Sequence, residues 1–362
     1  MRPSVAEKFP IVNDELEDFL PETDAVRAEL GERADSVRVR EASNVPQTAR
    51  VVCSDAEGSG GRVAIVDGCR TPFCKAGTDL ANMDVVDLSG VVTAELVARS
   101  GIEPESIDLS VFGVVVAALH APNLGREAIF RASLPAGIPG TSVNLACASS
   151  NRAITSGAEA ILSGQCEVVL AGGAESLSNV PIQYTQAASR QLIAFIKARS
   201  ASQKLAALTR LRPRDLVPVP PAIAEYSTGM TMGQAAEKMA KENGISRQAQ
   251  DEIALLSHKR AAAASRHGDF ERQIVATFPP PEYEHSVLRD NGVRDDSSLE
   301  ALAKLRPVFD KRYGSVTAGN SSPITDGAAV VLLMSEERAA REGYEPLGFI
   351  RSWAYALSLI HI

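Results

Sequence analysis

One cysteine in this chain stands where a predicted strand ends and a predicted helix begins. Cys147 follows the stretch 141–146 and precedes "SSNRAITSGAEAILSG", whose apolar residues recur at helical spacing. The N-terminus of a helix presents unpaired N–H groups and a positive dipole end, which favour a thiolate and can hold an oxyanion. Cys147 is therefore the candidate nucleophile. The competing interpretation is a small buried cysteine that only packs.

From residue 61 onward, short apolar runs alternate with segments of helical period. The predicted strands are 62–68, 110–119, 141–146 and 167–173. The predicted helices are 84–101, 123–134 and 150–164. This alternation is typical of an α/β domain.

Composition narrows the function classes. The 362 residues carry a formal net charge of -8, which disfavours general nucleic-acid binding. The chain has no apolar run of the roughly 20 residues that a membrane-spanning helix requires. Five cysteines without a CxxC pair, and five scattered histidines, favour neither a disulfide framework nor a metal site. We expect a reducing compartment and no metal.

The two flanks of this core differ from it. Residues 1–60 are polar and acidic, which predicts a solvated extension and argues against a mitochondrial presequence. Residues 181–314 lose the alternation and contain long helical patterns, including the segment 232–265. The apolar run near 325–335 resumes the pattern of the α/β core, and a further strand is predicted from residue 347.

Several long motifs resemble the thiolase family. "VNLACASSNRAITSGAEAILSGQCEVVLAGGAESLSNVP" is similar to its nucleophile region, "RVAIVDGCRTPF" to its first strand, and "SSLEALAKLRPVFDKRYGSVTAGNSSPITDGAAVVLLMSEERA" to its CoA-contacting stretch. The resemblance implies a thiolase-like layered α/β fold with a mixed sheet covered by helices. It assigns residues 61–180 and 315–345 to the N-terminal α/β domain, 181–314 to a helical loop domain, and 346–362 to the start of a second domain.

A narrower resemblance concerns the loop domain. "RLRPRDLVPVPPAIAEYSTGMTMGQAAEKMAKENGISRQAQD" is similar to the β subunit of the trifunctional fatty-acid oxidation complex, and Thr231 stands where short-chain thiolases usually carry histidine. This implies a 3-ketoacyl-CoA thiolase of fatty-acid β-oxidation that acts on longer chains. Its substrates would be 3-ketoacyl-CoA and CoA, and neither a metal nor a redox cofactor is implied.

The resemblance also implies contacts with CoA and the acyl chain. Arg294 matches an arginine near the adenine end, Met232 matches a methionine beside the acyl pocket, and the pantetheine tunnel is matched by Phe309, Ala318 and Ser322. The alternatives are a solvated arginine, core packing for Met232 and Phe309, and a turn role for Ser322.

Residues 176–214, the basic segment, contain no acidic residue although the chain is acidic overall. Its cations include Arg190, Lys197, Arg199 and Lys204, with apolar residues among them. One hypothesis is peripheral contact with anionic lipid. A second is docking to a hydratase/dehydrogenase subunit, and the third is a solvated surface.

The resemblance further implies a homodimer, and we expect a cytoplasmic protein of bacterial type, in peripheral contact with the membrane if the lipid hypothesis holds. The HEAF or NEAF, GHP and CxxGG-type motifs of a thiolase's second half do not occur in this sequence. We therefore expect a piece of a longer polypeptide, and a weak catalyst by itself, because acid–base groups contribute on the order of 10²–10⁴-fold. The alternative functions are a non-catalytic acyl-CoA or lipid-binding module, a ketoacyl synthase-type condensing enzyme and a Cys/His hydrolase.

Overall fold

The computed structural model describes residues 61–219, 224 and 228–355. The predicted acidic extension 1–60 and the residues 356–362 lie outside this described part. Seven strands form one sheet in the order β4-β3-β5-β6-β1-β7, and β2 pairs with β6. Their bounds are Val63–Arg70 (β1), Cys74–Lys75 (β2), Leu109–Gly113 (β3), Gly140–Val143 (β4), Val168–Ser176 (β5), Thr325–Ser335 (β6) and Gly348–Ile350 (β7).

The sheet is mixed, which confirms the predicted fold class. Strand β3 runs parallel to both β4 and β5, whereas β6 is antiparallel to β5 and β1. Parallel neighbours must end at the same edge of the sheet, so the chain leaves β4, β3 and β5 close together. That edge carries the candidate site.

Helices cover both faces of the sheet. Helices α3 (Val85–Ser100) and α4 (Leu124–Arg131) pack on one face, and α5 (Ser149–Leu162) packs on the other. Alternate residues of β5 serve the two faces, since Leu170 joins the α3 cluster and Val169 joins the α5 cluster. Burial on both faces explains why this strand is a continuous apolar run rather than an alternating one.

Two predicted strands are shorter than the sequence suggested. The prediction of 110–119 was too long, since β3 ends at Gly113 and Val115 is largely exposed. The predicted strand 141–146 likewise pairs only at 140–143. In both cases the chain leaves the sheet and passes the N-terminus of α5. Apolar residues there line a cavity instead of pairing with a neighbouring strand.

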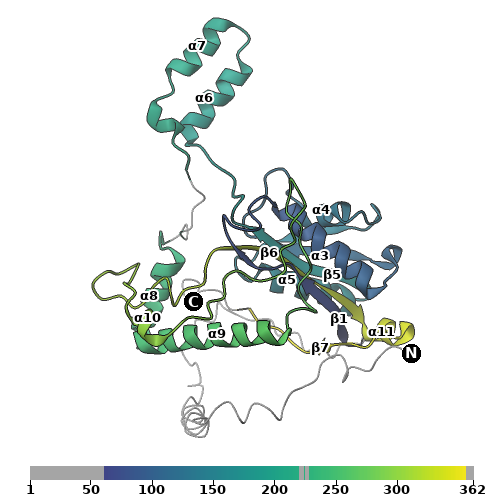
Figure 1. Cartoon of the computed structure of the whole chain (residues 1–362). Helices are drawn as coiled ribbons and strands as arrows, with labels where there is room; N and C mark the ends of the chain where they lie inside the picture. The colour runs from purple at the N-terminus through teal and green to yellow at the C-terminus, as the bar shows by residue number, and fades with distance from the viewer. Residues whose placement is uncertain (1–60, 220–223, 225–227, 356–362) are drawn as a thin grey trace, which may run out of the picture.

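The region between β5 and β6 is helical. It contains α6 (Gln186–Lys197), α7 (Ala201–Thr209), α8 (Met232–Glu242), α9 (Arg247–His267) and α10 (Leu299–Ala303). The predicted helical segment 232–265 is two helices, because Gly244 takes a left-handed φ of 65° and Ser246 caps α9. Helices α6 and α7 pack on each other and project away from the sheet (Figure 1).

The C-terminal part of the described chain returns to the sheet. Helix α11 (Glu336–Glu342) follows β6, and β7 pairs antiparallel with β1 at the sheet edge. The predicted assignment of 346–362 to a further domain stays a prediction; residues 348–350 join this sheet. In the part of the chain that the structure describes, no helix is long and apolar enough to cross a membrane.

Candidate active site

Cys147 lies in a tight turn between β4 and α5. Ala146 takes a positive φ of 47°, an uncommon conformation for alanine. The Ser149 hydroxyl closes the turn, since it accepts from Leu145 N at 2.9 Å and donates to the Ala146 carbonyl at 2.6 Å. Cys147 is exposed, and the N-cap of α5 is Ala148, which has no side-chain acceptor for the first-turn N–H groups. The Ser149 N–H donates to the Ala146 carbonyl at 3.1 Å, which leaves the N–H groups of Ser150 and Asn151 for an anion held at the cysteine.

Two glycines let the start of α5 approach the sheet this closely. A Cβ on Gly113 of β3 would lie within 2.6 Å of the Ser149 carbonyl oxygen and the Ser150 nitrogen. A Cβ on Gly173 of β5 would collide with the Ser150 hydroxyl. The turn formed by residues 145–149, the nucleophile turn, therefore leads into a helix start that packs directly against the backbone of β3 and β5. This close packing fixes the distance between the turn and the strand ends.

Cys147 opens into a cavity of about 810 Å³. Most of its lining is apolar and comes from the ends of β3, β5 and β6 and from the start of α8. The apolar lining residues include Phe73, Val114, Val115, Val116, Leu177, Val180, Met232 and Ile324. A cavity of this size and character suits a ligand with an acyl chain.

The other described cysteines contrast with Cys147. Cys69 and Cys74 are buried in the core, and burial raises the pKa of each thiol to about 12. Cys166 is partly exposed, and burial raises the pKa of its thiol as well. Among the four cysteines described, Cys147 is the one that is exposed in a cavity at a helix start. The interpretation of Cys147 as a packed, buried cysteine is therefore wrong.

One carboxylate in this cavity was missed by the sequence analysis. Glu175, near the end of β5, accepts hydrogen bonds from the N–H groups of Val115 and Val116 at 2.9 and 3.2 Å. Burial raises the pKa of this carboxyl group, and the two N–H donors partly oppose that effect. The available signal was an acidic residue within the "VVLAGGAES" strand, where an unpaired charge is unfavourable.

Only some of the residues predicted to contact CoA or the acyl chain lie at the Cys147 cavity. Met232, the first residue of α8, lines the Cys147 cavity, and the Phe309 ring lies against the adjacent Gly233. Ala318 and Ser322 are exposed on the segment that leads into β6, outside the residues that line the cavity. Arg294 is exposed beside α9, where its N–H donates to His258. The structure therefore brings Cys147 and Met232 together, while the CoA roles stay predictions.

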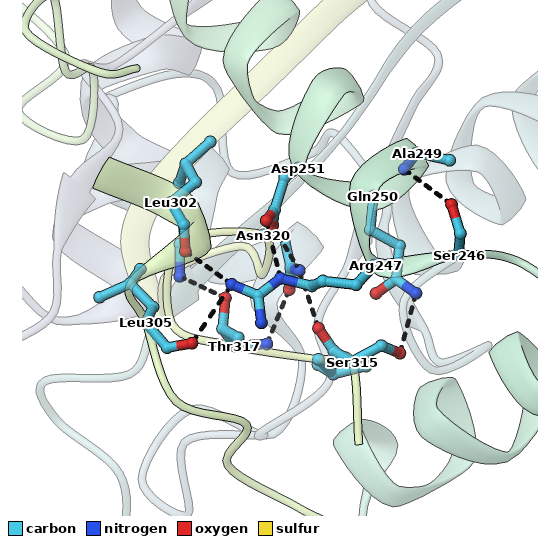
Figure 2. Close-up of polar contacts among 12 residues, drawn as sticks. Ser246, Arg247, Ala249, Gln250, Asp251, Leu302, Leu305, Ser315, Thr317 and Asn320 are labelled. Atoms are coloured by element: carbon cyan, nitrogen blue, oxygen red, sulfur yellow. Dashed lines mark hydrogen bonds and ion pairs between the residues drawn. The ribbon is translucent and has the colours of Figure 1, made fainter. Parts of the chain in front are cut away.

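The segment 315–320, which includes Ala318, is held by a buried network on α9 (Figure 2). Asp251 is only 3% exposed; it pairs with Arg247 at 2.7 Å and accepts from Asn320 at 2.9 Å. Asn320 in turn accepts from the Thr317 N–H. The Arg247 guanidinium also donates to the Leu302 carbonyl at 2.6 Å, which ties α10 to the same network.

A second buried carboxylate fixes the start of this segment. Glu237 of α8 accepts from the N–H groups of Ser315 and Val316. Burial opposes ionisation of Glu237, but these donors outweigh it, and the pKa of the carboxyl group is lowered. Within residues 61–219, 224 and 228–355, no three His, Cys, Asp or Glu side chains gather as potential metal ligands.

The fold and the site together define an α/β protein with an exposed cysteine at a strand-to-helix turn above the ends of parallel strands. Residues 63–337 match the family model described as the thiolase N-terminal domain. A 3-ketoacyl-CoA thiolase of Yersinia enterocolitica is 48% identical over 297 residues, which is 82% of this chain and 68% of that protein. One of Pectobacterium carotovorum matches to the same extent. The chain belongs to the thiolase family.

Solved structures agree with this assignment. The Bacillus anthracis acetyl-CoA acetyltransferase superposes with a TM-score of 0.71 at 33% identity, over 82% of this chain and 70% of that one. Human mitochondrial 3-ketoacyl-CoA thiolase in complex with CoA gives a TM-score of 0.67 at 27% identity, over 80% and 69%. The predicted family and fold are therefore confirmed.

Proposed function

We propose that the chain acts as a 3-ketoacyl-CoA thiolase, an acetyl-CoA C-acyltransferase, with Cys147 as the residue that carries the acyl group. The observation that supports this most is the exposure of Cys147 at the start of α5 inside a mostly apolar cavity. The named relatives and the family membership support the same substrate class.

The proposed reaction has two half-reactions. The Cys147 thiolate attacks the 3-keto carbon, the C2–C3 bond breaks, and its electron pair leaves on C2, which takes up a proton to give acetyl-CoA. The shortened acyl group stays on Cys147 as a thioester. A CoA thiolate then attacks that thioester carbonyl, and the acyl-CoA leaves as the Cys147 thiolate is restored.

The residues of this chain contribute binding and charge stabilisation to both steps. Because the Ser149 N–H already donates to the Ala146 carbonyl, we propose the N–H groups of Ser150 and Asn151, at the start of α5, for the oxyanion that forms when either thiolate attacks. Met232 would contact the acyl chain from across the cavity. We also propose Phe309, Ala318 and Ser322 for the pantetheine arm and Arg294 for the adenine end.

Acylation of Cys147 is the direct test. The 362-residue chain is incubated with an acyl-CoA, and peptide mass spectrometry locates the added acyl group. We expect the group on Cys147, no uptake by the Cys147→Ala variant, and normal uptake by the matched Cys69→Ala variant. An acyl group that appears equally on several cysteines would contradict the proposal.

A non-catalytic acyl-CoA-binding module is the second candidate, favoured by the apolar cavity alone. It predicts saturable binding of acyl-CoA that leaves every cysteine unmodified and survives in Cys147→Ala. The two candidates are thus separated by one experiment, because binding and covalent transfer are read in the same sample.

We also propose that the α6–α7 hairpin contacts an anionic lipid surface. Ile196 and Leu205 are 78% and 63% exposed. Arg190 and Lys197 lie on α6, Lys204 lies on α7, and Arg199 lies in the short connection between the two helices. Exposed apolar side chains among cations are the pattern of interfacial helices. The alternative is that the hairpin binds a partner subunit of a fatty-acid oxidation complex. Separately, we propose that the protein forms a homodimer, acts in β-oxidation and is located in the cytoplasm.

Vesicle co-sedimentation tests the lipid contact. We expect binding to vesicles rich in phosphatidylserine, weaker binding to neutral phosphatidylcholine, and loss of binding when the four cations are replaced by Glu. The control replaces Lys259 and Arg260 of α9 by Glu, which are exposed but outside the hairpin. Equal binding by the hairpin variant would remove the lipid interpretation and leave the partner subunit or a solvated surface.

A further inference from the structure

Three parallel strands end together beneath Cys147, and each contributes to one line of hydrogen bonds. Asn144 directly follows β4, Val115 lies two residues beyond β3, and Glu175 is the penultimate residue of β5. The strand order β4-β3-β5 places them side by side along the same edge.

The hydrogen bonds run from the carboxylate to the nucleophile turn. Val115 donates its N–H to Glu175 at 2.9 Å, and its carbonyl accepts from Asn144 Nδ2 at 3.1 Å. Asn144 Oδ1 then accepts from the Ala146 N–H at 3.1 Å. Val116 adds a second donor to Glu175. The Val116 N–H and the Val115 carbonyl belong to the same peptide group, so Glu175 and the residue before Cys147 are linked through that peptide and the Asn144 side-chain amide.

The residues at the two ends of this hydrogen-bonded chain, Ala146 and Glu175, are both in unfavourable states that need an explanation. Ala146 takes a left-handed φ of 47°, which an alanine keeps only where its surroundings hold it. Glu175 is a half-buried carboxylate on a strand that is otherwise small or apolar. A buried carboxylate is unfavourable unless its oxygens accept hydrogen bonds, and here the donors belong to the loop that also contacts Asn144.

We propose that Glu175 and Asn144 are positioning residues that hold the Cys147 turn in its reactive geometry. This inference rests on the proposed acyl transfer to Cys147. Neither side chain needs to touch the substrate. Their effect is to hold the Ala146 N–H and so keep the Cys147 sulfur in a fixed position at the start of α5, from which it can attack.

Four variants separate positioning from local structure. Glu175→Ala removes both acceptors, whereas Glu175→Gln keeps one. Asn144→Asp keeps the acceptor for the Ala146 N–H but places an oxygen against the Val115 carbonyl, so it breaks only the link to Glu175. Glu105→Ala, an exposed carboxylate on the short helix 104–106, is the control.

Two measurements are made on the full chain. Hydrogen exchange reports the mobility of segment 144–149, and single-turnover acylation gives a maximal rate and a half-saturating acyl-CoA concentration. We expect roughly five-fold faster exchange in Glu175→Ala and Asn144→Asp, as the loss of one or two hydrogen bonds produces. We expect the maximal rate to fall roughly ten- to a hundred-fold at unchanged half-saturation, with Glu175→Gln intermediate.

Each outcome decides the proposal. If Glu175→Ala changes exchange only around residues 113–117, and leaves 144–149 and the acylation rate as in the wild type, the proposal is overturned. If the wild type takes up no acyl group, the proposed function fails, and exchange at 144–149 alone decides whether Glu175 holds the turn. If alkylation of Cys69 and Cys74 shows that Glu175→Ala is unfolded, Glu175→Gln and Asn144→Asp carry the test.

Discussion

The nucleophile turn and the segment 315–320 both hold candidate functional residues, but they are fixed by different forces. The turn that carries Cys147 is pressed against strand ends at Gly113 and Gly173, where the sheet offers only backbone. The segment that carries Ala318 is instead held by two buried carboxylates. Asp251 accepts from the Asn320 side-chain amide (Figure 2), and Glu237 accepts from the Ser315 N–H.

This difference predicts different sensitivities. Close packing tolerates no added volume, because backbone cannot move aside without disturbing the sheet. A buried carboxylate network depends instead on ionisation and on the presence of each partner. Added methyl groups on Gly113 or Gly173 should therefore displace the turn that carries Cys147, whereas removal of a buried charge should loosen the segment 315–320.

The largest expected effect tests the packing. Gly113→Val places side-chain carbons against the Ser149 backbone, and we expect a loss of about 3 kcal/mol in the free energy of unfolding, with α5 displaced. The matched Gly137→Ala variant, whose Cβ meets nothing within 4 Å, should change stability by less than about 0.5 kcal/mol. Denaturant unfolding of both variants measures the change in the free energy of unfolding. A Gly113→Val protein as stable as the wild type would show that close packing at Gly113 does not fix the turn.

A smaller effect is expected on the carboxylate side. Asp251→Ala leaves Arg247 and Asn320 without their acceptor, and we expect a loss of about 2 kcal/mol. Hydrogen exchange should become faster at 315–320 while segment 144–149 keeps its protection. The control is Glu252→Ala, an exposed neighbour on α9. Equal loosening of both segments would show that the two regions are not held independently.

The smallest effect concerns pH. The Lys241 ammonium, 2.6 Å away, and the N–H groups of Tyr313 and Arg312 lower the pKa of Asp310 to about 2. A lowered carboxyl pKa stabilises the fold above the ordinary value, and that contribution disappears as pH falls through about 2.

Asp310→Asn should therefore be slightly less stable than the wild type at pH 7, with the difference shrinking below pH 4 and vanishing near pH 2. Thermal unfolding across this range measures it, with the exposed Asp296→Asn as control. A difference that grows on acidification has the wrong sign and would show that Asp310 is not stabilised as a carboxylate.

Local sequence predicted much of the core. The helices near 84–101 and 150–164 were recognisable because their apolar spacing, and for the first the Asp84 cap and Gly101 end, are local signals. The strands were less well bounded. The apolar residues 114–116 look like strand but line a cavity, and an apolar run alone does not distinguish these environments.

The candidate site divides in the same way. Cys147 at a strand-to-helix junction was readable because the junction is a local feature of about 20 residues. The contact of Glu175 with Val115 joins residues 60 positions apart, and that of Asn144 with Val115 joins residues 29 apart. Such pairs carry no signal in one sequence. The sequence showed only an acidic residue within a strand, and the contact of Glu175 with the loop near Cys147 was visible in the structure alone.

The sequence by itself determined the α/β class, the family motifs and the choice of Cys147 as the candidate nucleophile, because each depends on residue type and short-range spacing. The tertiary structure decided that β6 lies antiparallel between β5 and β1, that Met232 reaches the Cys147 cavity, and that two carboxylates hold the segment 315–320. These features arise when distant segments bury their apolar faces against one sheet, and only that packing brings their polar groups within hydrogen-bonding distance.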